Sequence, residues 1–83
     1  MLTVSELKCL LTLLNYDEIE FFGFGDCDSI VYFDAFIDTY YRVMCKIHAD
    51  SVIEVHDTTF DVDHYVKIAD ARKVSDKWVV TYN

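Results

Sequence analysis

Basic residues are scarce in this sequence. The chain of 83 residues carries 7 Lys and Arg against 15 Asp and Glu, which gives a formal net charge of −8. Direct binding of nucleic acid needs Lys and Arg clustered on one face, and docking on an anionic lipid surface needs a basic patch. We therefore expect neither nucleic acid nor a membrane as a direct ligand of this chain.

Long apolar runs, proline and paired cysteines are also missing. No apolar run approaches the roughly 18 residues that indicate a membrane-spanning helix, and the N-terminus lacks the basic start of a secretory signal. The three cysteines form no C-x-x-C pair, and their odd count predicts free thiols, buried as small apolar side chains, in a reducing cytosol. We expect a cytoplasmic protein with free Cys9, Cys27 and Cys45.

The first 14 residues predict a helix, because they hold all six leucines of the chain. Thr3 and Glu6 match the T-x-x-E capping box at its start, and Asn15 is a plausible stop. An apolar stripe at i, i+3, i+4 and i+7 can bury against a sheet. We expect a helix over residues 4–14 whose stripe is Leu7, Leu10, Leu11 and Leu14.

The rest of the chain is rich in Val, Ile, Phe and Tyr, which favours strands. Residues 30–48 alternate between apolar and mixed positions, and this run is longer than the usual strand of about 3–10 residues. We expect it to break near Asp34–Asp38. A second helix at about residues 29–41 is the alternative. Further expected strands cover residues 18–24, 52–56, 65–74 (or a short helix at its start) and 77–82, with a turn at Ser75–Asp76.

These elements together predict one α+β domain over residues 1–83. In it, an N-terminal helix packs on a small antiparallel, meander-like sheet of about 4–5 strands. No catalytic motif is present, so we expect neither an enzyme nor a cofactor. Histidines and aspartates late in the chain are the weak candidates for a metal-dependent enzyme, since a zinc site needs about four converging ligands. They are His48, His56, His64, Asp61 and Asp63.

Charge is distributed unevenly along the chain. Residues 1–41 hold one basic and eight acidic residues, and no basic residue lies between Lys8 and Arg42. On extended backbone, carboxylates at i and i+2, as in Glu18 with Glu20, lie about 6.6 Å apart on one face. Aromatic side chains are interleaved with these acids and are typical anchors of protein interfaces. The candidate partner-binding residues are Asp17, Glu18, Glu20, Asp26, Asp28, Asp34 and Asp38, with Tyr32 and Tyr40 as anchors.

The acidic span Asp17–Asp38 with its aromatics, in a short chain without proline, resembles small phage-encoded inhibitors, among them anti-CRISPR proteins and DNA mimics. The likeness is one of composition and charge pattern. It implies a protein that inhibits a basic nucleic-acid-binding partner, such as a CRISPR nuclease or another host defence protein, by occupying its nucleic-acid site without catalysis. If the chain is phage-encoded, its location is the host cytoplasm. A self-associating structural or accessory domain, such as a homodimer, is the alternative.

Overall fold

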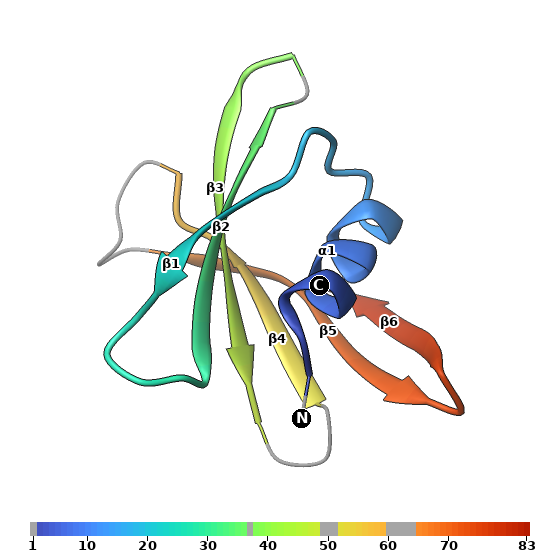
Figure 1. Ribbon diagram of the computed structural model, residues 1–83. Coiled ribbons are helices and arrows are strands. Elements are labelled where there is room, and N and C mark those ends of the chain that lie inside the picture. Colours follow the sequence, from blue (N-terminus) through green and yellow to red (C-terminus); the bar gives the residue numbers. More distant parts are fainter. Residues whose placement is uncertain (1, 37, 49–51, 60–64) are drawn as a thin grey trace.

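The computed structural model describes residues 2–36, 38–48, 52–59 and 65–83. Within them the chain forms one helix followed by six strands, joined into a single antiparallel sheet with the order β1-β2-β3-β4-β5-β6 (Figure 1). Every strand therefore pairs with its neighbour in the sequence, as expected of a meander. The elements are α1 (Val4–Leu13), β1 (Glu20–Phe24), β2 (Ile30–Phe36), β3 (Tyr40–Ile47), β4 (Val52–Asp57), β5 (Val66–Val74) and β6 (Lys77–Tyr82).

The fold is mostly β with one short helix, and the expected number of strands was too low. Residues 30–48 form two full strands, β2 and β3, and residues 66–74 form one strand without a helical start. The alternative helix over residues 29–41 is wrong. Alternation explains why: Val31, Phe33 and Ala35 of β2 are buried on one face, while the residues between them are partly exposed.

Both ends of α1 follow their sequence signals. The Glu6 N–H donates to Thr3 Oγ1, and the Thr3 N–H donates to Glu6 Oε1, each at 3.2 Å, which completes the capping box. After the helix, Asn15 is left-handed (φ 70°), and the N–H groups of Asn15 and Tyr16 donate to carbonyls of the last turn. This is a Schellman arrangement, in which asparagine tolerates the left-handed position. No helix in the described part of the chain could cross a membrane.

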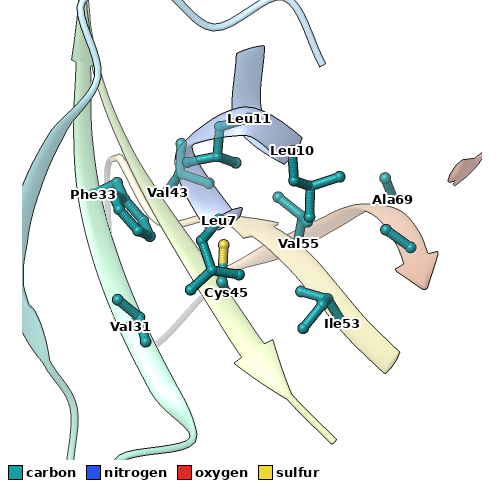
Figure 2. Close-up of a cluster of buried hydrophobic side chains, with 11 residues drawn as sticks. Leu7, Leu10, Leu11, Val31, Phe33, Val43, Cys45, Ile53, Val55 and Ala69 are labelled. Atoms are coloured by element: carbon teal, nitrogen blue, oxygen red, sulfur yellow. The ribbon is translucent and has the colours of Figure 1, made fainter. Parts of the chain in front are cut away.

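The core lies between α1 and one face of the sheet (Figure 2). Leu7, Leu10 and Leu11 are buried beneath the helix, as the predicted stripe requires, while Leu14 is half-buried. The sheet residues that complete this cluster come from β2, β3, β4 and β5. They are Val31, Phe33, Val43, Cys45, Ile53, Val55, Ala69 and Ala71. The opposite face of the sheet carries no helix within the described residues (Figure 1).

One ion pair joins the helix to the far part of the sheet. Lys73 Nζ of β5 donates to Glu6 Oε2 at 2.6 Å, while the other oxygen of the same carboxylate caps the helix. The hydrogen bond from Lys73 lowers the pKa of Glu6, and the bond to Glu6 raises the pKa of Lys73. Glu6 therefore belongs to the fold, as part of both the cap and the docking of α1.

The turn between β5 and β6 is also where the sequence places it. Ser75 and Asp76 have φ values of 50° and 63°, the two consecutive left-handed residues of a type I′ hairpin. This turn fixes the register in which Arg72 lies opposite Val79 and Lys73 opposite Trp78.

Candidate protein-binding surface

Strand β1 (sequence Glu-Phe-Phe-Gly-Phe) is an edge of the sheet, because β2 is its only neighbour in the strand order (Figure 1). The exposed fractions of Phe21, Phe22 and Phe24 are 38%, 56% and 55%. A register shift between Phe21 and Gly23 marks a bulge at Phe22. The ring of Phe21 contacts those of Phe24 and Phe33 on the helix side, whereas Phe22 lies over Arg42. The edge strand therefore presents phenylalanine on both faces.

Acidic side chains lie at both ends of β1. Asp17 and Glu18 precede the strand, Glu20 begins it, and Asp26 and Asp28 follow it in the turn to β2. All five are exposed, and no basic residue occurs among residues 17–28. We call the β1 strand with these five carboxylates the β1 surface.

The extended spacing expected for these acids is not present. Glu18 lies outside β1 with a left-handed backbone (φ 46°), and Asp26 and Asp28 lie in a turn. The carboxylates therefore form two groups separated by the strand, in place of one continuous row along extended backbone.

Asp34 differs from the other candidate acids because a cation neutralises it. Arg42, directly opposite on β3, donates from Nε to Asp34 Oδ1 at 3.0 Å, and the Tyr40 hydroxyl donates to the same oxygen at 2.8 Å. Burial and this bond raise the pKa of Tyr40. The guanidinium carbon of Arg42 also lies 3.6 Å from the centre of the Phe22 ring. Asp34 and the Tyr40 hydroxyl are thus bonded within the fold. Although no basic residue lies between Lys8 and Arg42 in the sequence, the fold places Arg42 beside Asp34 and Phe22.

The two remaining candidates flank this pair. Asp38 is exposed in the connection between β2 and β3, and Tyr32 is half-buried on β2. The Phe36 N–H donates to the Asp17 carbonyl at 2.9 Å, which brings the end of β2 beside the chain that enters β1. Asp38 follows two residues later, so it lies nearer to the Asp17–Glu20 group than to Asp26 and Asp28.

Of the candidate metal ligands, the structure brings His48 and His56 close together, on either side of Glu54. Glu54 lies between two histidines: its Oε2 contacts His48 Nε2, and its Oε1 lies 3.2 Å from His56 Nε2. The hydrogen bonds to these histidines lower the pKa of Glu54, while burial lowers that of His56. Asp61, Asp63 and His64 lie outside the described residues. Among the described residues no group of three or more His, Cys, Asp or Glu side chains could hold a metal ion.

Two further features bear on chemistry. The three thiols are free, but only Cys45 is buried; Cys9 and Cys27 are exposed, which corrects the expectation that all three are buried. A hollow of about 190 Å³ on the uncovered face is lined by Val52, Asp70, Ala71, Arg72, Val79 and Thr81. That volume lies below the roughly 300–1,000 Å³ of typical ligand pockets.

The phenylalanines of β1 are the residues that our sequence interpretation left out of the site. Their signal is present in the sequence: Phe21, Phe22 and Phe24 do not alternate with polar residues, so the strand cannot hide all of its apolar side chains on one face. Comparisons of the chain with protein-family models, with curated proteins and with solved structures found no match.

Proposed function

We propose that this protein is a small acidic binding protein that inhibits a basic nucleic-acid-binding partner by occupying the partner's nucleic-acid site, without catalysis of its own. The partner class that the resemblance to phage inhibitors suggests is a CRISPR nuclease or another host defence protein. The observation that carries the proposal is the β1 surface, where exposed phenylalanines lie between two groups of carboxylates that form no ion pair with any described residue.

The charge of this surface supports binding to a basic groove. Five carboxylates and no cation fall within residues 17–28, on a molecule whose net charge is −8. Such a field attracts a basic protein over distances of about 10 Å at moderate salt and raises the rate of encounter.

The length of the β1 surface also suits a groove built for a nucleic-acid strand. Glu20 and Asp26 are six positions apart in the sequence, so the chain between them spans at most about 20 Å. Phosphates along one DNA strand rise by roughly 3.4 Å per step, so the same length spans about six nucleotides. Between its acidic ends the surface offers aromatic rings, which anchor protein interfaces.

The test compares two pairs of substitutions that change the net charge equally. One variant carries Asp26→Asn and Asp28→Asn in the β1 surface; the control carries Asp70→Asn and Asp76→Asn on the β5–β6 hairpin. A partner retrieved from host lysate at low salt is purified, and its binding to each variant is measured with a DNA oligonucleotide as competitor. We expect weaker and less salt-dependent binding for the first variant alone, and displacement by DNA. Equal binding of the two variants, or no competition by DNA, would contradict the proposal.

Self-association is the second candidate, because both edges of the sheet, β1 and β6, lack a neighbouring strand in the described fold. Exposed Phe22 and Tyr82 lie on these edges. Sedimentation equilibrium over a range of concentrations distinguishes the two functions: a mass that stays at 9.7 kDa removes self-association.

A further inference from the structure

We propose that the free edge of β1 binds an extended basic segment of the partner as an added antiparallel or parallel strand. This inference rests on the proposed function and specifies how its surface docks. Strand addition uses backbone hydrogen bonds for affinity and alternate side chains for specificity. It therefore requires an accessible edge, backbone groups that point outward, and side chains that favour one kind of segment.

No strand in the described part of the chain pairs with the outer side of β1, and the backbone orientation of this edge can be assigned. The Gly25 N–H donates to the Ile30 carbonyl at 2.8 Å, so Gly25 points toward β2. Because N–H and carbonyl directions alternate along a strand, the backbone groups of the preceding residue, Phe24, point away from β2 toward the open edge. The high exposure of the Phe24 side chain (55%) is consistent with an uncovered position.

Features that normally protect an edge strand are few here. Natural edges are blocked by lysine, proline, inward-pointing charge or bulges. β1 contains neither lysine nor proline, and its protective features are the bulge at Phe22 and the charge of Glu20 at its start. An added strand would meet Phe21 and Phe24 on the helix side of the sheet and Phe22 on the opposite side. The matching segment therefore has apolar residues at its centre.

Charge selects a basic segment and disfavours a second copy of this chain. In an antiparallel pair of β1 strands centred on Phe22, Glu18 of one copy comes near Asp26 of the other. In a parallel pair each acidic group meets its own duplicate. Like charges placed across neighbouring strands are destabilising. A segment with lysine or arginine at both ends instead meets an opposite charge at each end of β1.

The test uses a synthetic peptide with two lysines at each end and alternating valine and threonine between them. Its binding is measured to the whole protein and to the variants Phe24→Ala and Phe24→Pro. Both variants lose the ring, but only proline loses the outward N–H, and it leaves the bonds from β1 to β2 intact. We expect Phe24→Pro to bind the peptide at least about tenfold more weakly than Phe24→Ala. The proline variant loses one backbone hydrogen bond to the peptide, and its pyrrolidine ring crowds the incoming strand.

A second arm leaves the protein unchanged, so that a folding defect in Phe24→Pro does not decide the result. The same peptide, N-methylated at every residue between its lysines, keeps its charge but has no backbone donor on either edge of its central segment, and we expect it to bind at least about tenfold more weakly. Equal affinity for both peptides, absence of peptide binding, or a mass showing self-pairing through β1 would each overturn strand addition. If the two peptides bind equally but the variant with Asp26→Asn and Asp28→Asn loses binding to the purified partner, strand addition is wrong. The proposed function would then still hold, with charge as the basis of binding.

Discussion

The Asp34 carboxylate is bonded within the fold, whereas the carboxylates at the ends of β1 are exposed. Substitutions at the two kinds of position should therefore affect stability differently. Asp34 Oδ1 accepts from Arg42 Nε at 3.0 Å and from the Tyr40 hydroxyl at 2.8 Å. The variant Asp34→Asn keeps an acceptor oxygen at this position but removes its charge. Asp26→Asn makes the same chemical change at an exposed turn position and serves as the matched control.

The expected cost of Asp34→Asn follows from these two bonds. In the bond from Tyr40 a charged acceptor becomes neutral, which replaces a contribution of about 1.5–3 kcal/mol by one of about 0.5–1.5 kcal/mol and so loses roughly 1 kcal/mol. Arg42 stays charged, so its bond keeps one ionised partner and loses only the attraction between the two charges, which is about 0.2–1 kcal/mol for a partly exposed pair. The side chains of Asp34 and Arg42 are 20% and 24% exposed, and solvent screening reduces the ionic part. We therefore expect a loss of about 1–2 kcal/mol from a total of roughly 4–12 kcal/mol for a domain of this size.

Urea unfolding followed by circular dichroism measures this loss. With a dependence of about 1 kcal/mol per molar urea, the midpoint of Asp34→Asn should fall by about 1–2 M. The midpoint of Asp26→Asn should shift by less than about 0.5 M, because exposed substitutions rarely exceed about 0.5 kcal/mol. Coincident midpoints for the two variants would refute the assignment of Asp34 to the fold.

Three further predictions concern the core, acid stability and the thiols. Leu10→Ala should lower the free energy of unfolding by about 2–5 kcal/mol, because Leu10 is buried beneath α1. Leu13→Ala, on the exposed side of the same helix, should change it by less than about 0.5 kcal/mol. Similar urea midpoints for these two variants would contradict the packing of α1. Burial lowers the pKa of His56 from 6.5, so the unfolded chain takes up this proton first. The contribution of this group to stability is complete above about pH 6.5 and is lost as the pH falls toward the pKa of His56 in the folded protein. In His56→Phe the urea midpoint should therefore depend less on pH below about 6.5, and the same pH dependence as in the unchanged protein would contradict this. Burial raises the pKa of Cys45 to about 12, so iodoacetamide should modify only the two exposed thiols of the native protein; mass spectrometry showing a third adduct without denaturant would contradict this.

Local signals in the sequence were sufficient for the helix and most strands. The capping box at Thr3, the leucine stripe and Asn15 specify α1 within one turn of chain on either side. Likewise, Ser75–Asp76 supports a left-handed hairpin turn without help from the rest of the fold. The strand count was harder, because residues 30–48 contain no glycine, proline or asparagine to mark the turn between β2 and β3.

The candidate site could be predicted less well, for a related reason. Asp34 and Arg42 lie opposite each other because the β2–β3 hairpin turns about Asp38. The sequence placed the break only within Asp34–Asp38, and a shift of one residue in the turn changes which side chains face each other. No local sequence signal indicates the left-handed backbone of Glu18. The expectation that Glu18 and Glu20 lie on extended backbone with their carboxylates on one face was therefore wrong, and the sequence alone could not have shown this.

The fold also changes which part of the net charge bears on function. Of the eight acidic residues among residues 1–41, Glu6 pairs with Lys73 and Asp34 pairs with Arg42. No ion pair within the described residues engages the other six, and five of these flank β1. An edge strand without lysine or proline invites pairing with other copies, and carboxylates at both of its ends oppose that pairing. The same carboxylates attract a basic segment, so one charge pattern keeps copies of the chain apart and leaves the edge open to a different partner.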